Sequence, residues 1–169
     1  LWTSEKAGKV MGELMEYVDV CIANEEDAEK VFGISAGKSD VTGGKLEQDG
    51  YTTVAAELKK QFGFQKVAIT LRTSLSASDN RWAGMLFDGS DYFFSKEYPV
   101  HIVDRVGGGD SFGGGLIYAV KNGYGSADAI EFAVAASCLK HSIDGDFNQV
   151  SSAEVETLRG GDASGRVQR

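Results

Sequence analysis

The sequence predicts an α/β fold, and three observations carry that prediction. Two strand patterns, 17–24 and 66–72, have the length of buried strands, and the second contains a continuous apolar run, which is typical of a parallel strand covered on both faces. Helical apolar spacing at 4–17, 25–34 and 51–63 alternates with these runs. Later in the chain, a glycine-rich stretch joins a further strand pattern to a helix pattern.

The boundaries of the first three helices follow from capping residues. We expect Ser4 to cap the first helix, and Asn24 and Gly33 to bound the second. Residues 35–50 are polar and rich in glycine, so they predict a loop. The third helix is expected to end at Gly63.

The middle of the chain predicts short strands joined by tight turns. Strand patterns occupy 81–88, 91–95 and 98–103, and the sequence DGSD at 88–91 suits a hairpin loop. A helix over 109–122 then begins inside the glycine-rich stretch and stops at an Asn-Gly pair.

Two more helices complete the prediction. Ser126 is the expected cap of a long helix over 126–142. Ser151 and Glu154 fit a capping box at the start of a final helix. The polar tail, 160–169, is expected to fray.

Composition excludes several classes of protein. The 25 acidic residues outnumber the 17 basic ones, giving a net charge of −8, which argues against nucleic acid as the main partner. No apolar run is long enough to predict a membrane span. Cys21 and Cys138 have no metal-ligand spacing, and we expect both to be reduced in a cytoplasmic protein.

The stretch DRVGGGDSFGGG at 104–115 predicts an anion-binding site. It leads from a strand into a helix N-terminus, where free amides and the helix dipole favour negative charge. A dinucleotide fingerprint would need a third glycine five residues after Gly107, and that position is Phe112. A P-loop would need a lysine, which the stretch lacks.

Asp110 adds a carboxylate to this anion site. A carboxylate would repel a phosphate that only binds there, but it suits a site where a hydroxyl must lose its proton as it attacks a phosphoryl group. The alternative is that Asp110 merely caps the helix and that the glycines form an ordinary turn.

The string DRVGGGDSF resembles the second signature of the ribokinase-like carbohydrate kinases, Asp-Thr-x-Gly-Ala-Gly-Asp-x-Phe, with Arg105 in place of threonine and Gly108 in place of alanine. The resemblance implies a three-layer α/β fold with a mostly parallel central sheet. It also implies that Asp110 is the catalytic base. The amides of Gly107, Gly108 and Gly109 would form the anion hole for the transferred phosphoryl group.

The same resemblance implies metal sites. NEED at 24–27 matches an Asn-x-x-Glu element that organises Mg²⁺, with Asn24 and Asp27 as the matching residues, although an Asn cap with an acid three residues on is also ordinary capping. Asp104 matches an aspartate beside a monovalent-cation site, which implies K⁺. The main-chain carbonyls that would complete that site are those of Lys140, Ile143 and Gly145.

Nucleotide contacts are implied at ITLRTS, 69–74, where Thr70, Arg72 and Ser74 are the candidates for binding ATP. Arg72 stands where the family has glycine, so it is either a phosphate ligand or a solvated charge at a strand end. The helix over 126–142 and the turn after it resemble the segment that closes the adenine pocket. We assign no chemistry to His101 or His141.

Within the family, the sequence is most similar to bacterial 2-keto-3-deoxygluconate kinases, which implies transfer of the γ-phosphoryl group of ATP to the terminal hydroxyl of that sugar acid. Family members are about twice as long, so the resemblance implies that 1–169 is the C-terminal, ATP-binding half. The first strands and the β lid would then lie in an absent N-terminal half. We expect this half alone to be inactive and the full-length protein to be a homo-oligomer.

Two alternatives remain open. Another ribokinase-like kinase, acting on fructose, ribose or a nucleoside, would share the same loop, and a substrate panel distinguishes it. A non-catalytic nucleotide-binding module would also use the glycines, but it would gain nothing from the carboxylate of Asp110.

Overall fold

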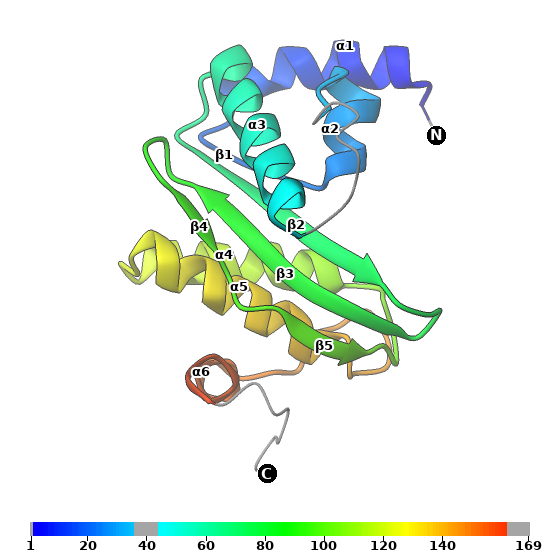
Figure 1. Cartoon of the computed structure of the whole chain (residues 1–169), viewed down its shortest axis with the longest axis vertical. Helices are drawn as coiled ribbons and strands as arrows, with labels where there is room; N and C mark the ends of the chain where they lie inside the picture. The colour runs from blue at the N-terminus through cyan, green and yellow to red at the C-terminus, as the bar shows by residue number, and fades with distance from the viewer. Residues whose placement is uncertain (1, 36–43, 162–169) are drawn as a thin grey trace. The chain divides into compact units, whose positions relative to one another are not determined.

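The computed structural model describes residues 2–35 and 44–161, which form two compact units. The first unit comprises 1–70 and 85–92, and the second comprises 71–84 and 93–169. The order of elements along the chain (Figure 1) is α1 (Ser4–Leu14), a 3₁₀ turn (Met15–Tyr17), β1 (Val20–Ala23), α2 (Glu25–Phe32), α3 (Gly44–Phe62), β2 (Lys66–Ser74), β3 (Asp79–Phe87), β4 (Tyr92–Phe94), β5 (Tyr98–His101), α4 (Gly108–Lys121), α5 (Ser126–Lys140) and α6 (Ser152–Gly160).

The strands confirm the α/β class and form a mixed sheet. Their order is β1-β2-β3-β4, and β5 pairs with β3. β1 and β2 are parallel, with Val20 opposite Lys66, whereas β3 and β5 are antiparallel, with Trp82 opposite Tyr98.

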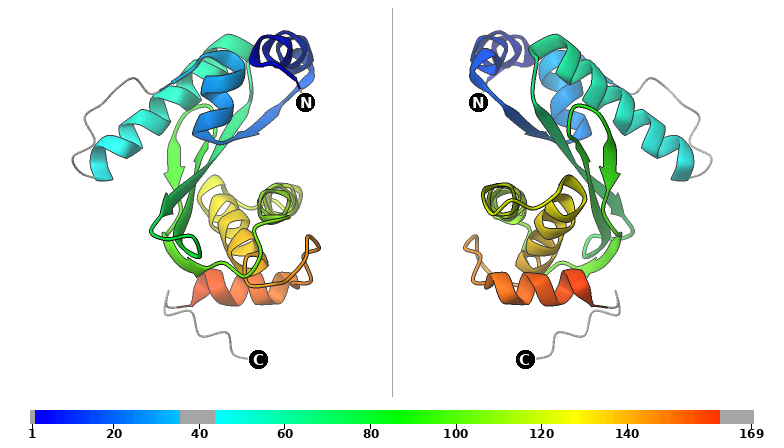
Figure 2. Two further views of the ribbon diagram at one scale, coloured as in Figure 1. Left: turned by 90° about the vertical axis from the view of Figure 1, so that its right-hand side faces the viewer. Right: turned by 90° about the vertical axis from the view of Figure 1, so that its left-hand side faces the viewer.

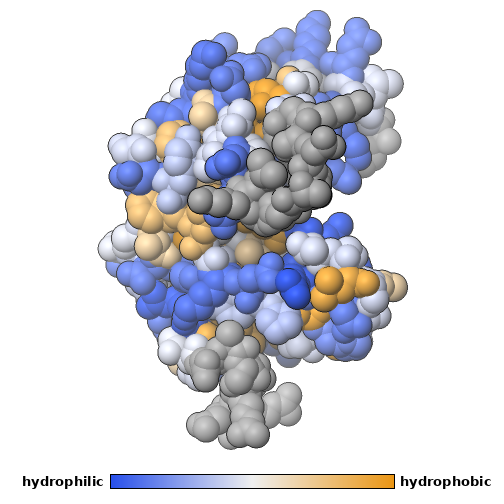
Figure 3. Space-filling model, in the orientation of Figure 1, coloured by the Kyte–Doolittle hydropathy of each residue, from blue (hydrophilic) through white to orange (hydrophobic). Residues whose placement is uncertain are grey.

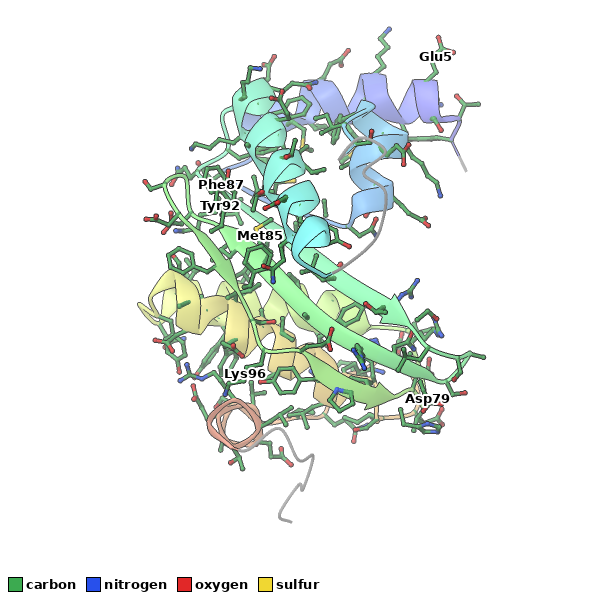
Figure 4. All side chains as sticks on the ribbon, in the orientation of Figure 1. Glu5, Asp79, Met85, Phe87, Tyr92 and Lys96 are labelled. Carbon is green, nitrogen blue, oxygen red and sulfur yellow. The ribbon has the colours of Figure 1, made fainter. Side chains whose placement is uncertain are left out.

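The first unit is built around β2 and the helices that cover it. Three consecutive β2 residues, Val67, Ala68 and Ile69, have no exposed surface, as expected for a parallel strand covered on both faces. Val54 and Leu58 of α3 are equally buried. At the β3–β4 hairpin, the rings of Phe87 and Tyr92 stack with their centroids 4.4 Å apart, and Figure 4 shows the two side chains together.

Two boundaries in the first unit differ from the sequence prediction. Thr3, not Ser4, is the N-cap of α1, because the Thr3 hydroxyl accepts the Lys6 amide at 3.2 Å. Residues 35–50 were expected to form a loop, but α3 already begins at Gly44. The rest of that predicted loop, at 36–43, lies outside the described residues.

The second helix of the first unit matches its prediction closely. Asn24 caps α2 by accepting the Asp27 amide at 2.8 Å, and Asp27 accepts the Asn24 amide in return at 3.4 Å. Gly33 ends the helix in the left-handed conformation, with φ of 68°.

In the second unit, α4 and α5 lie side by side, as both views of Figure 2 show. Small residues allow this close approach: a Cβ at Gly115 would lie 3.0 Å from the Cα of Ala133 and 3.1 Å from the Cβ of Ala136. Gly84 of β3 gives similar room, since a Cβ there would lie 2.8 Å from Val134. The α4–α5 pair is therefore closely packed, and the glycine loop leads into the N-terminus of α4.

The last helix is tied to the second unit by polar contacts. Lys96 donates to the Arg159 carbonyl at 3.0 Å, and its position beside α6 is visible in Figure 4. The Ser151–Glu154 capping box is confirmed. Ser126, however, is not a cap: Gly125 is the N-cap of α5 and no side chain caps that end. Of the tail, 162–169 lies outside the described residues.

Figure 3 shows a largely hydrophilic face on which apolar residues gather in a few patches. Within the described part of the chain, no helix is both long enough and apolar enough to cross a membrane. Cys21 and Cys138 are free and buried, and burial raises the pKa of the Cys21 thiol to about 11.

Candidate functional site

The glycine loop opens α4 through an unusual backbone conformation at Gly107. This residue is the N-cap of the helix and has φ of 79°, a left-handed conformation that disfavours any side chain. A Cβ at this position would lie 2.1 Å from the Asp146 carbonyl oxygen. Gly107 is therefore required both by the turn and by the chain that passes against it.

The other two glycines of the loop differ from Gly107 and from each other. A Cβ at Gly108 would lie 2.8 Å from Cε1 of His141, and the Gly108 amide donates to the Arg105 carbonyl at 3.2 Å. A Cβ at Gly109 would meet no atom within 4 Å. Gly108 thus packs inward, whereas Gly109 faces open space.

Free backbone donors collect at the start of α4. Among the described residues, no protein group accepts the amides of Gly107, Gly109 or Asp110, and the helical hydrogen bonds begin at Ser111, which donates to the Gly107 carbonyl at 2.9 Å. Unpaired amides at a helix N-terminus are favourable partners for an anion. Because the Gly108 amide is engaged with Arg105, the donor set differs from the predicted trio of glycines.

Asp110 lies in the first turn of α4 and is exposed. No side chain caps this end of the helix, so Asp110 does not act as the cap that the alternative interpretation assigned to it. Within the described part of the chain, its carboxylate makes neither a hydrogen bond nor an ion pair. The carboxylate is therefore available to a ligand.

Asp110 and Gly107 line a cavity of about 570 Å³ in the second unit. Aromatic side chains from three segments, Tyr118, Phe132 and Phe147, line the same cavity. The remaining lining residues are Ser111, Gly114, Gly115, Ala136, Asp146, Asn148, Val150, Ser152 and Val155. The cavity thus brings the Asp110 carboxylate and the start of α4 together with aromatic, apolar and polar side chains.

Residues at the C-terminal end of α5 support the glycine loop. The Ser137 hydroxyl donates to the Gly108 carbonyl at 2.8 Å, and the His141 ring contacts the Ser137 carbonyl through Nδ1 at 2.7 Å. The indole of Trp82 lies against the same imidazole, with ring centroids 5.0 Å apart. Burial lowers the pKa of His141, and the charges of Lys140, Arg105 and Arg72 add to that effect against the opposing hydrogen bond to Ser137.

His141 and Trp82 were not assigned any role from the sequence. Nothing in the local pattern indicates them, because their contact joins α5 to β3 across 59 residues of chain. Trp82 Nε1 and the side-chain amide of Asn80 are buried and have no hydrogen-bond partner among the described residues. An ordered water is the usual partner for such atoms.

Asp104 precedes the loop and accepts backbone donors through both of its carboxylate oxygens. Its two carboxylate oxygens accept the amides of Val106 and Gly145, each at 2.9 Å. These hydrogen bonds are the main reason that the pKa of Asp104 is lowered, and the charge of Lys140 contributes further. Asp104 therefore clamps the 143–146 turn against the start of the glycine loop.

The remaining predicted residues are divided between the units. Arg72 and Ser74, on β2, share the second unit with the loop, and the Ser74 hydroxyl donates to the Ser76 carbonyl at 3.3 Å. Thr70, Asn24 and Asp27 belong to the first unit, and their contribution to the site stays a prediction. Within the described residues, no group of three or more His, Cys, Asp or Glu side chains could hold a metal ion.

Comparison with known proteins gives a family match over most of the chain. The model of the pfkB family carbohydrate kinases matches residues 1–148. The chain is 52% identical to the crystal structure of 2-dehydro-3-deoxygluconokinase from Thermotoga maritima, a match that covers 95% of this chain and 47% of that one with a TM-score of 0.87. The chain therefore spans about half the length of that relative.

Two further structures extend the comparison. A PfkB family carbohydrate kinase from Listeria grayi is 29% identical, with 95% of this chain and 47% of that chain covered and a TM-score of 0.80. A putative ribokinase II from Escherichia coli, in complex with ATP and Mg²⁺, is 19% identical, with coverages of 89% and 42% and a TM-score of 0.63. At that identity the last match shows a shared fold alone.

Proposed function

Because the chain belongs to the pfkB family of carbohydrate kinases, we propose that the protein it forms transfers the γ-phosphoryl group of ATP to the terminal hydroxyl of 2-keto-3-deoxygluconate, also called 2-dehydro-3-deoxygluconate, or of a related sugar acid. The substrate class rests on the 52% identity to the Thermotoga enzyme. The observation that carries the chemistry is the unpaired Asp110 carboxylate, which lines a cavity beside the free amides at the start of α4.

Asp110 is the general base of the proposed reaction. Its carboxylate accepts the proton of the attacking hydroxyl as that oxygen forms a bond to phosphorus, and ADP departs as the bond to its terminal oxygen breaks. Asp110 lies in the first turn of α4, which packs closely against α5. A base placed beside the reacting groups lowers the barrier through its position as well as through proton transfer.

The amides of Gly107, Gly109 and Asp110 stabilise the charge on the transferred group. They are the donors left unpaired at the helix N-terminus, and the helix dipole reinforces them. Gly108, which stands where the family motif has alanine, supports this hole by packing on His141 rather than by donating to the anion. The open side of Gly109 leaves room for the phosphoryl group to approach.

The aromatic side chains that line the cavity are proposed to hold the base and ribose of ATP. Its volume of about 570 Å³ is ordinary for a nucleotide-sized ligand, and Tyr118, Phe132 and Phe147 offer apolar surfaces to a purine. Mg²⁺ is bound in proteins mainly through substrate phosphates and water with one or two carboxylates, so it would enter with ATP. Asn24 and Asp27 remain the proposed residues that organise it.

The proposal is tested with the full-length protein by measuring ADP release with 2-keto-3-deoxygluconate and with a panel of fructose, ribose and a nucleoside. We expect the sugar acid to give the highest kcat/KM, and a preference for any other member of the panel would contradict the assigned substrate class. Asp110→Asn is expected to reduce kcat by about 10²–10⁴-fold while the Kd for ATP changes less than about twofold.

Asp91→Asn is the matched control, because Asp91 is an exposed aspartate in the β3–β4 hairpin. It is expected to leave kcat unchanged. If Asp110→Asn kept most of the wild-type kcat, Asp110 would not be the base. If Asp110→Asn instead abolished ATP binding together with catalysis, its role would be in binding.

A further inference from the structure

Lys140 occupies an unexpected position beneath the glycine loop. It is the last residue of α5 and has no exposed surface, although lysine is rarely buried completely. Its Nζ donates to the Ile143 carbonyl at 3.1 Å. Its Cε lies 3.2 Å from the point where a Cβ of Gly107 would stand. The ammonium therefore lies under the turn that begins α4.

This arrangement does not fit the K⁺ site that the family resemblance implies. One of the proposed carbonyl ligands, Ile143, accepts the Lys140 ammonium, and the Lys140 carbonyl accepts the Ile143 amide at 3.0 Å. Both oxygens of Asp104 accept backbone amides. A metal ion placed among these groups would lie next to the Lys140 ammonium, and the two positive charges would repel each other at short range.

The charge of Lys140 is not neutralised by an ion pair. Among the residues that the structure describes, no carboxylate forms a salt bridge with it. Its field nevertheless reaches Asp104, where it adds to the amides of Val106 and Gly145 in lowering the pKa of the carboxyl. Burying an uncompensated ammonium costs stability, and the cost is offset only where a partner of negative charge shares the site.

We propose that the Lys140 side chain is a tethered monovalent cation, which takes the place of K⁺ beneath the glycine loop and makes the protein independent of that ion. This inference rests on the proposed kinase function. An ammonium carries the same charge as K⁺, and its N–H groups bond to the same kind of carbonyl oxygen. Lys140 touches neither the hydroxyl nor the base, so it is a positioning residue: it holds the 143–146 turn against Gly107 and adds positive charge under the anion hole.

A purely structural lysine would give a different result from a cation substitute. If Lys140 only closes the turn, removing it weakens the protein equally in every salt. If it replaces K⁺, removing it leaves space for K⁺ beside the Ile143 carbonyl and within the electrostatic reach of the Asp104 carboxylate. The distinguishing property is therefore a response to K⁺ that the variant gains and the wild type lacks.

The experiment uses the full-length protein in KCl and in tetramethylammonium chloride, each at about 0.1 M so that screening is equal. Lys140→Met removes both charge and donor, whereas Lys140→Gln removes the charge but keeps a donor for Ile143. Lys121→Met, at an exposed lysine in the last turn of α4, is the matched control. Melting temperature and kcat are measured for each protein in both salts.

We expect the wild type and Lys121→Met to show kcat values that differ less than about twofold between the salts. Both Lys140 variants are expected to lose about tenfold or more in kcat in tetramethylammonium and to recover most of it in KCl. KCl should also raise the melting temperature of both variants and leave that of the wild type unchanged.

A wild type that K⁺ activates several-fold would overturn the proposal, as would Lys140 variants that melt and turn over identically in the two salts. The melting arm needs no substrate, so it decides the role of Lys140 even if the sugar-acid kinase activity is not found. If neither variant folds, the response of the wild type to K⁺ alone still decides between a tethered and a free cation.

Discussion

The sharpest test of the loop compares Gly107→Ala with Gly109→Ala, two identical changes separated by one residue. At Gly107 the left-handed backbone, with φ of 79°, costs an alanine about 1–2 kcal/mol. The added methyl group would also lie 2.1 Å from the Asp146 carbonyl oxygen, which is backbone and cannot rotate away. Overpacking of this kind adds about 1–3 kcal/mol, so we expect a total loss of about 2–5 kcal/mol in the free energy of unfolding.

Gly109→Ala should behave in the opposite way. Gly109 is not among the glycines of positive φ, and its Cβ would meet nothing within 4 Å. An alanine in a helix is favoured over glycine by up to about 1 kcal/mol, so stability should be kept or should rise. Activity should still fall by about 10–100-fold, because the methyl group would stand where the phosphoryl group must approach the amides.

Urea denaturation of the full-length variants measures the first effect, and kcat/KM measures the second. A Gly107→Ala protein within about 1 kcal/mol of the wild type would refute the steric reasoning, since both costs are read from the backbone itself. A Gly109→Ala protein that is stable and fully active would show that the open side of this glycine is not used by a ligand.

Two further predictions concern residues that support the site. Burial lowers the pKa of His141 below its usual 6.5, so the unfolded chain binds more protons than the folded one, and the free energy of unfolding should fall as the pH drops below about 6.5. His141→Gln should remove this pH dependence in melts across pH 5 to 8. If the same dependence persisted in the variant, His141 would not be its source. Asn24→Ala should lose about 1 kcal/mol by removing the cap of α2. Asn24→Ser should restore stability but not kcat at low Mg²⁺, and recovery of both would show that Asn24 only caps the helix.

The parts of the site that the sequence predicted are those encoded by short-range patterns. A strand, a run of glycines and an apolar helix face are local signals, and they placed α4 and Asp110 almost to the residue. The capping boxes at Asn24 and Ser151 were predictable for the same reason. The caps assigned to Ser4 and Ser126 were wrong because a neighbouring residue, Thr3 or Gly125, adopts the extended backbone that an N-cap needs.

The parts that could not be predicted depend on contacts between distant segments. No local pattern distinguishes Gly107, which the Asp146 backbone confines, from Gly109, which faces open space.

The proposed cation site shows even more clearly that a local sequence pattern cannot predict contacts between distant segments. Where main-chain carbonyls bind an ion, any side chain is compatible with the ligand positions. A sequence motif therefore cannot show whether a side chain fills the ion site. At the end of α5, a lysine is the expected partner of a helix C-terminus. The complete burial of Lys140 and the approach of its Cε to Gly107 are contacts between distant segments, and the tethered-cation proposal rests on them.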